Sequence, residues 1–490
     1  MIIKKIALTL IFVLGITNFC SIGTYADDRY VWQNNNGKWY YYEDQNVLKG
    51  WQIYNNDWYY LGATGEMQTG WIQDAGKWYY LYSDGSMAHD TFIGDFEVGS
   101  DGAWIEKEKK YTFNEGVNKF CIDSSSQLLT GSNKDNNYTY SPVSLFMALA
   151  VLSEGADNDT KVDMMKGLNI SEPDKLSTDF MNLYKKEIFK NDTGMCKIAD
   201  SVWIDNNNKE VSFNKDILKK VQNNYNAGIF ERDLQDSETS KEIASYLNEQ
   251  TDDKLNLESS QFKALDNEVM DIFNTVYFKD SWLKAFDEND TAEDYFTLEN
   301  GNKVSTDFMN KTYSTSINKG NNYVSCSIPF RNGQKMMFIL PNEDINCDYM
   351  LNNKEELNEA LSSLDSDTSQ RVELSLSLPK FDFSSSYTLN DMLKKIGFEN
   401  IYNTSAADFS KYSKDGELYV SNVKQQSRVS IDEYGAEAAA YTEISMVSSA
   451  APDFNKEYYD MKLNRPFIFA ITNNDNTPLF LGVVNNPNAK

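Results

Sequence analysis

Histidine is nearly absent from this sequence: His89 is the single histidine among 490 residues, and it lies close to the amino terminus. Ser-His-Asp and Cys-His catalysis in the rest of the chain is therefore excluded, as are zinc sites built from histidine. Enzymes that use a Ser-Lys pair or two carboxylates remain compatible with this composition, but no spacing suggests either. We expect no catalytic residue, no metal and no cofactor.

Positive charge and long apolar runs are also scarce. The chain has 46 Lys and Arg residues against 73 Asp and Glu residues, for a formal net charge of −27. Nucleic acids and anionic membrane surfaces attract cationic patches, so this balance disfavours both as partners. The one apolar run near the amino terminus is too short to span a membrane, and no second run follows it.

Residues 1–26 have the features of a secretory signal peptide. Lys4 and Lys5 precede an apolar core from Ile6 to Ile16, and Thr24-Tyr25-Ala26 is an acceptable small-residue cleavage site. We therefore expect a secreted, extracellular protein.

Cysteine is sparse once this peptide is removed. The four cysteines that remain have no C-x-x-C spacing, which argues against a metal or redox motif. They are Cys121, Cys196, Cys326 and Cys347. Buried free thiols are the favoured interpretation, and disulfides are the alternative.

An internal repeat occupies residues 27–104. Tryptophans fall seven residues apart within each unit, at Trp32 and Trp39, Trp51 and Trp58, and Trp71 and Trp78, and the units recur every 19 to 20 residues. A turn signal such as Ser83-Asp84-Gly85-Ser86 follows each aromatic strand, so each unit is predicted to form a β-hairpin. One hairpin cannot bury its own apolar face, so we expect the units to stack as an all-β solenoid.

These units resemble the cell-wall-binding repeats of the choline-binding and glucan-binding families, of the form G-W-x-x-x-x-G-x-W-Y-Y-L. The resemblance implies aromatic cages that hold a quaternary ammonium group by cation–π attraction. One cage would contain Trp32, Trp39 and Tyr60, the next would contain Trp51, Trp58 and Tyr80, and Trp71 and Trp78 would take a partner from the tail between Phe96 and Trp104. The ligand would be a choline-substituted or glucan wall polymer. The alternative is that these rings only form the core of the solenoid.

Residues 430–452 carry two contradictory structural signals. From Ala436 to Met446 every second residue is small or apolar, and most of the residues between them suit water. This alternation is typical of a strand with one buried face. Yet the stretch is rich in Ala, which strands avoid, and it ends in a Ser-Ser-Ala-Ala-Pro sequence typical of exposed loops. The segment fits both an exposed loop and a buried strand, and an Ala-rich helix with a linker is the alternative on propensity alone.

The segment from Glu433 to Ala440 resembles the E-x-G-[TA]-E-A-A-A hinge of the serpin family, the large serine-protease inhibitors. Other segments resemble serpin motifs in family order: Tyr140–Leu145, Ala199–Trp203, Ala244–Lys254, Asn274–Trp282 and Leu479–Pro487. The resemblance covers residues 105–490. It implies an α+β serpin fold, in which a central β-sheet with flanking helices can accept a reactive-centre loop as an extra strand.

The family's functional residues carry over to three places in this chain. The hinge comprises Glu433, Gly435, Ala436, Glu437, Ala438, Ala439 and Ala440. The reactive bond falls at Ser449–Ala450, and neighbouring bonds from Met446 to Ala451 stay open because the segment up to Pro466 is longer than in typical relatives. The sheet-opening cluster comprises Ser141, Ser144, Asn274 and Gln425, with Gln425 in place of the usual His, and Trp282 lies at the top of the sheet.

The resemblance implies a secreted inhibitor of a serine protease, or of a cysteine protease, held non-covalently at the cell wall by the repeats. Small residues at the inward hinge positions favour an inhibitory member, and small residues around the reactive bond favour elastase-like or subtilisin-like targets. A non-inhibitory serpin-fold surface protein is the alternative. A wall hydrolase, which such repeats often accompany, is disfavoured by the lack of histidine.

Overall fold

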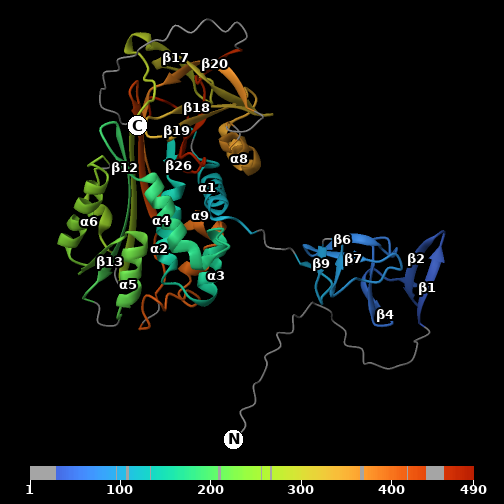
Figure 1. Cartoon of the computed structure of the whole chain (residues 1–490). Helices are drawn as coiled ribbons and strands as arrows, with labels where there is room; N and C mark the ends of the chain where they lie inside the picture. The colour runs from blue at the N-terminus through green and yellow to red at the C-terminus, as the bar shows by residue number, and fades with distance from the viewer. Residues whose placement is uncertain are drawn as a thin grey trace. The chain divides into compact units, whose positions relative to one another are not determined.

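Two compact units, Met1–Lys109 and Lys110–Lys490, make up the computed structural model of this chain (Figure 1). The structure describes residues 29–489 except 95, 106–109, 133, 208–210, 255, 265–267, 363, 365–368, 416–417 and 437–456. The expected signal peptide therefore lies outside the described residues. Within the described part, no helix is both long and apolar enough to cross a membrane, and no group of His, Cys, Asp or Glu side chains is placed to hold a metal ion.

The first unit contains three consecutive β-hairpins. They are β1 (Tyr30–Asn35) with β2 (Lys38–Glu43), β4 (Gly50–Tyr54) with β5 (Asp57–Leu61), and β6 (Gly70–Asp74) with β7 (Lys77–Leu81). The two turn residues of each hairpin have positive φ angles: Asn36 and Gly37, Asn55 and Asn56, and Ala75 and Gly76. Two successive positive φ angles define the type I′ turn, whose twist matches that of the strands. The predicted hairpins are confirmed.

Backbone hydrogen bonds link each hairpin to a later unit. Met67 N donates to Trp39 O at 2.7 Å, and Met87 N donates to Trp58 O at 2.8 Å. Leu61 and Leu81 are buried. The remaining strands of the unit are β3 (Asn46–Val47), β8 (Thr91–Ile93), β9 (Phe96–Val98) and β10 (Trp104–Ile105). The units therefore stack as the hairpin period predicts.

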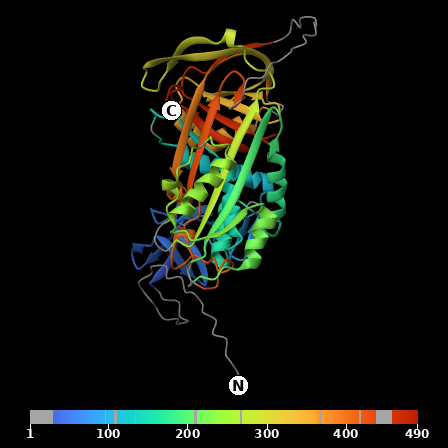
Figure 2. The ribbon, with the colours of Figure 1, turned by 90° about the vertical axis from the view of Figure 1, so that its left-hand side faces the viewer.

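A central sheet organises the second unit, with strand order β12-β13-β15-β23-β22-β21 and β14 paired to β13. The strands are β12 (Phe189–Lys190), β13 (Gly194–Asp205), β14 (Gly228–Arg232), β15 (Met270–Ser281), β21 (Phe381–Thr388), β22 (Lys424–Ile431) and β23 (Gly435–Ala436). The long strands β13 and β15 lie side by side (Figure 2) and pair in antiparallel fashion along Gly194–Ile204.

A second large sheet has the order β11-β26-β25-β19-β18-β17-β20-β24, with β16 paired to β17. Its strands are β11 (Tyr138–Tyr140), β16 (Ala292–Thr297), β17 (Lys303–Lys319), β18 (Tyr323–Pro329), β19 (Lys335–Pro341), β20 (Gln370–Pro379), β24 (Tyr458–Lys462), β25 (Phe467–Thr472) and β26 (Pro478–Val484). β25 and β26 are buried along their whole length. Their continuous apolar sequence follows from burial on both faces.

Helices surround the central sheet (Figure 1). They are α1 (Phe113–Leu129), α2 (Pro142–Ser153), α3 (Asn158–Gly167), α4 (Leu176–Glu187), α5 (Lys215–Tyr225), α6 (Ser237–Gln250), α7 (Cys347–Asn352), α8 (Lys354–Ser362) and α9 (Asn390–Lys395). Helix α2, apolar nearly all round, packs against β15 and β26. Helix α6 packs on β13 and β15 through Ile243 and Leu247, which share a core cluster with Trp203 of β13.

The core of the second unit also contains polar groups. All four cysteines are buried and free, in agreement with the favoured interpretation of the sequence. Asp200 on β13 is buried as well, and its Oδ1 accepts a hydrogen bond from Asn274 Nδ2 of β15 at 2.8 Å. Burial raises the pKa of Asp200 to about 7, against the opposing effect of the Asn274 hydrogen bond. The ionised carboxylate therefore destabilises the fold at neutral pH.

We expect Asp200→Asn to stabilise the protein at pH 8 by about 1–3 kcal/mol, because an amide avoids burying a charge and can donate to Asn274 Oδ1. That oxygen is buried and has no partner among the described residues. The pKa of Asp200 is higher in the folded protein than in the unfolded chain. The loss of unfolding free energy caused by ionisation of Asp200 is therefore absent below about pH 4, grows as the pH rises and is complete above about pH 7. Urea unfolding at pH 4.5 and pH 8 measures the difference. An equal gain at both pH values would contradict this assignment.

Candidate functional site

The described part of the hinge enters the central sheet as β23. Gly435 pairs with Ser281 and Ala436 with Asp280, both at the end of β15, and Ala436 also pairs with Ile431 of β22. A Cβ atom on Gly435 would lie 2.1 Å from Asp280 O, so only glycine fits at this approach. The chain leading into the loop therefore already lies between the two strands that would have to separate.

Trp282 directly follows β15 and contacts the segment that leads into the hinge. Its side chain is fully buried and stacks on Phe330, with ring centroids 4.4 Å apart. Its indole Nε1 donates to Asp432 O at 2.9 Å, and its backbone N donates to Tyr434 O at 2.9 Å. The sequence-based position for Trp282 agrees with these contacts, which tie β15 to the segment before β23.

Glu433 is the charged anchor of the hinge. Its side chain is 5% exposed, lies 2.6 Å from Lys380 Nζ and accepts a hydrogen bond from Thr291 Oγ1 at 2.7 Å. Burial alone would raise the pKa of Glu433, but hydrogen bonds from Lys380 and Thr291 outweigh it and lower that pKa. The carboxylate therefore stays charged and fixes the start of the hinge beside β21.

Asp280 stands where the serpin motif has glycine. Its buried carboxylate accepts hydrogen bonds from Asn332 N at 3.0 Å and Asn332 Nδ2 at 2.9 Å. Burial raises the pKa of Asp280 to about 6, and the Asn332 hydrogen bonds oppose that shift. The motif alone did not indicate a role for this residue, but its backbone pairing with Ala436 places it in the site.

The four residues of the predicted sheet-opening cluster do not meet as one group. Gln425 Nε2 donates to Ser141 O at 2.9 Å, and its Oε1 accepts from Ser141 N at 2.8 Å. Asn274 instead bonds to Asp200, because it lies opposite Asp200 in the β13–β15 ladder. Ser144 is buried on α2, and no hydrogen bond between described residues joins its side chain to the other three. Of the four expected members, only Ser141 and Gln425 therefore bond to each other, while Asn274 is paired with Asp200 on the β13–β15 side.

The rest of the predicted loop lies outside the described residues. This holds for Glu437, Ala438, Ala439 and Ala440 of the hinge and for the reactive bond at Ser449 and Ala450.

The aromatic residues of the repeats form clusters with a different membership from the predicted cages. Tyr60 packs on Trp51 and Tyr80 packs on Trp71, with ring centroids 5.0 Å and 5.3 Å apart. The reason is the hairpin register, which sets Trp51 opposite Tyr60 and Trp71 opposite Tyr80 on one face of each hairpin. The predicted groupings of Tyr60 with Trp32 and Trp39, and of Tyr80 with Trp51 and Trp58, are wrong.

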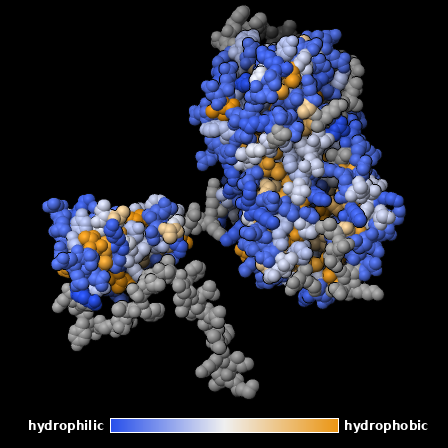
Figure 3. Space-filling view, turned by 180° about the vertical axis from the view of Figure 1, so that it is seen from behind, coloured by the Kyte–Doolittle hydropathy of each residue, from blue (hydrophilic) through white to orange (hydrophobic). Residues whose placement is uncertain are grey.

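Three aromatic clusters replace them on the repeat unit. Hydrophobic residues are also exposed on the face of this unit seen in Figure 3. The first cluster contains Trp32, Tyr41, Tyr54 and Tyr59; the second contains Trp51, Trp58, Tyr60 and Tyr79; the third contains Trp71, Tyr80, Phe96 and Trp104. Trp51 lies 6.4 Å from Trp58 between ring centroids, and Trp71 lies 5.4 Å from Phe96 of the tail, whereas Trp78, expected beside Trp71, makes no ring contact among the described residues. Trp39 and Trp78 are 44% and 41% exposed and stand outside these ring contacts.

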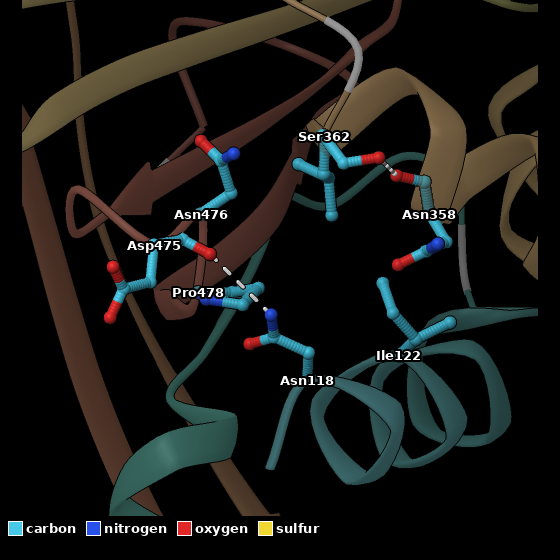
Figure 4. A pocket seen from close by; sticks show the side chains of 8 residues that line it. Asn118, Ile122, Asn358, Ser362, Asp475, Asn476 and Pro478 are labelled. Carbon is cyan, nitrogen blue, oxygen red and sulfur yellow. Dashed lines mark hydrogen bonds between the residues drawn. The ribbon is translucent and has the colours of Figure 1, made fainter. Parts of the chain in front are cut away.

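The second unit contains a small cavity (Figure 4). It measures about 40 Å³ and lies between α1, α8 and the turn before β26. Asn118 Nδ2 donates across it to Asp475 O at 3.5 Å. Organic ligands require roughly 300–1,000 Å³, so this cavity has room only for water.

The geometry defines a fold in which the two-residue strand β23 lies between β15 and β22 of the central sheet. Residues 115–487 match the family model for serpins, described as serine protease inhibitor, and the chain belongs to this family. Residues 48–92 match the model for the choline-binding repeat.

Curated relatives carry inhibitor names. The chain is 29% identical over 356 residues to the plasma serine protease inhibitor of Homo sapiens, covering 71% of this chain and 84% of that protein. It is 26% identical over 376 residues to alpha-1-antiproteinase S of Cavia porcellus, covering 75% and 89%. Family membership and these relatives support a role as a protease inhibitor.

Solved structures show the same fold. The native thermophilic serpin tengpin has 28% identity and a TM-score of 0.67, over 78% of this chain and 96% of that one. A serpin of Arabidopsis in its native stressed conformation, at 22% identity, also has a TM-score of 0.67, over 77% and 100%. The serpin fold predicted from the sequence is confirmed.

We expect Glu433→Gln to destabilise the native protein by about 1–2 kcal/mol, because it removes the ion pair between a buried carboxylate and the partly exposed Lys380. Urea unfolding measures this loss. Lys380→Gln should cost a similar amount, and the double variant should cost less than the sum of the two. As a matched control, Glu238→Gln removes the exposed pair with Lys241 and should leave stability unchanged. Additive losses at Glu433 and Lys380 would show that the pair is not coupled.

Proposed function

We propose that residues 105–490 inhibit serine proteases, or a cysteine protease, as a suicide substrate. In this mechanism the protease cleaves the loop and forms an acyl-enzyme, and the loop then enters the central sheet between β15 and β22. The observation that carries the proposal is the pairing of Gly435 and Ala436 with β15 and β22. These residues already occupy the first positions of the strand that insertion would complete.

The energetics favour such a step. Each inserted residue can satisfy backbone groups along the facing edges of β15 and β22, and small inward side chains let the sheet part and close. A protease domain is stable by roughly 5–15 kcal/mol, so insertion must release energy on that scale to hold the enzyme deformed. A native state that stores this energy is kinetically trapped and releases strain upon loop insertion.

The reactive bond stays a prediction from sequence, at Ser449–Ala450 or a neighbouring bond between Met446 and Ala451. The small side chains there suit elastase-like or subtilisin-like enzymes, whose pockets are shallow. No Arg or Lys lies nearby in the sequence, which disfavours a trypsin-like target.

Localisation forms the second part of the proposal. Residues 1–26 direct secretion, and residues 27–104 attach the protein non-covalently to a choline-substituted or related wall polymer. Supporting observations are the match to the choline-binding repeat and the three aromatic clusters, since several sites in one chain give avidity on a polymer. A non-inhibitory serpin-fold surface protein is the alternative. An SDS-stable complex with a member of a protease panel distinguishes the two.

Ala438→Arg should convert the inhibitor into a substrate, because a charged side chain at an inward position cannot enter the buried face of the sheet without a large desolvation cost. Cleavage should continue while the yield of SDS-stable complex falls at least about tenfold. Ala439→Arg is the matched control: by the period-two alternation of an inserted strand its side chain would face outward, so the complex should stay intact. Unchanged complex formation by Ala438→Arg would show that position 438 does not become buried.

Trp58→Ala should weaken attachment to choline-bearing walls by about tenfold, because it removes a ring from the second cluster. Sedimentation with purified walls, with free choline as competitor, measures attachment. Protease inhibition by the same variant should be unchanged, and Tyr419→Ala, an exposed residue of the second unit, should not affect attachment. Release by soluble glucan but not by choline would identify a carbohydrate ligand instead.

A further inference from the structure

Asp74 is an acidic residue within the second aromatic cluster. It ends β6, but its carboxylate reaches the preceding hairpin, where Oδ2 accepts from Trp51 Nε1 at 3.0 Å and Oδ1 accepts from Tyr60 OH at 3.4 Å. Both donors belong to the cluster of Trp51, Trp58, Tyr60 and Tyr79. The three side chains are half-buried, so the carboxylate is oriented yet reachable from solvent.

The repeats supply an internal comparison for this residue. The last position of the first strand of each hairpin is Asn35, Tyr54 or Asp74, and each pairs with the first residue of the following strand. Tyr54 packs its ring on Trp32 and Tyr41 of the preceding hairpin. Asp74 stands in the corresponding place beside Trp51 and Tyr60. This position is thus aromatic in the first cluster and anionic in the second. The second cluster also contains Trp58, whose counterpart Trp39 stands outside the ring contacts.

Asp74 has no countercharge among the described residues. Its register partner is Lys77, but Lys77 Nζ lies 3.1 Å from Asp101 Oδ2. The two hydrogen bonds from Trp51 and Tyr60 come from neutral donors and leave the charge of the carboxylate uncompensated. A positive ligand at this cluster would meet aromatic faces and a full negative charge together.

We propose that Asp74 makes the second cluster selective for cationic ligands, namely a quaternary ammonium group such as choline. The first cluster, built from Trp32, Tyr41, Tyr54 and Tyr59, has the ring of Tyr54 in the place of the Asp74 carboxylate and discriminates less between charged and uncharged ligands. This inference rests on the proposed wall-binding function of the repeats and adds to it a residue that determines specificity. The first and second aromatic clusters therefore differ in their selectivity for a charged ligand.

The test compares two ligands of the same shape on the full-length protein. Choline and its uncharged isostere 3,3-dimethylbutan-1-ol are titrated at low ionic strength by calorimetry and tryptophan fluorescence. Asp74→Asn should weaken choline binding by about three- to fivefold at one class of site, since a partly exposed ion pair contributes at most about 1 kcal/mol. Binding of the isostere should stay unchanged. The difference between the two proteins should shrink at high salt, because the charge is screened.

Control variants separate the possible outcomes. Asp44→Asn removes an exposed acid of the first hairpin whose backbone has a positive φ that Asn also tolerates, and it should change neither ligand's affinity. If Asp74→Asn weakens the binding of both ligands equally, Asp74 only supports the fold of the cluster. If the variant binds choline as tightly as the unaltered protein, the charge of Asp74 is not used. Either result overturns this inference but leaves the proposed wall-binding function standing. Failure of the unaltered protein to bind choline would instead overturn the proposed wall-binding function, and the inference with it.

Discussion

The pairing of the short strand β23 with its two neighbours determines how the central sheet of the second unit is connected. Gly435 and Ala436 bridge β15 and β22 at one end of the central sheet, and the strand order connects these two strands only through β23. The sheet is thereby divided into a half with β13 and β15 and a half with β21 and β22. The two halves meet at β23, where Gly435 and Ala436 pair with β15 and Ala436 pairs with β22.

The residues of the expected sheet-opening cluster form their hydrogen bonds on separate sides of this boundary. Asn274 and Asp200 lie together on the β13–β15 side, whereas Ser141 and Gln425 form a pair on the other side. Contacts cross the boundary at the hinge, through Trp282 and the segment before β23. They also cross it away from the hinge, where Arg428 Nη1 of β22 donates to Lys254 O at 3.4 Å and Ser421 Oγ donates to Glu268 at 2.9 Å. Separation of the strands therefore does not require breaking a hydrogen bond within the expected four-residue cluster. The start of the hinge is held separately by Glu433, whose ion pair with Lys380 fixes it beside β21.

The repeat unit is stabilised by contacts between successive hairpins. Each hairpin exposes an aromatic face that it cannot bury alone, and bonds such as Met67 N to Trp39 O place the next unit against it. The resulting clusters repeat in geometry but vary in chemistry at the end of each first strand. The chain in this way combines a repeat unit with a serpin unit, each with its own core.

Local sequence patterns were sufficient for much of this protein. The hairpins of the repeats and the hinge residues Gly435 and Ala436 are encoded within a few residues, since backbone geometry and side-chain period act locally. The tertiary structure alone decided which distant groups meet. Tyr60 packs on Trp51 rather than Trp32 because strand register sets its neighbours, Asn274 bonds to Asp200 because β13 lies against β15, and the carboxylate of Asp74 reaches Trp51 only after two hairpins have stacked. Such contacts depend on how elements pack in three dimensions, and residue spacing along the chain does not contain that information.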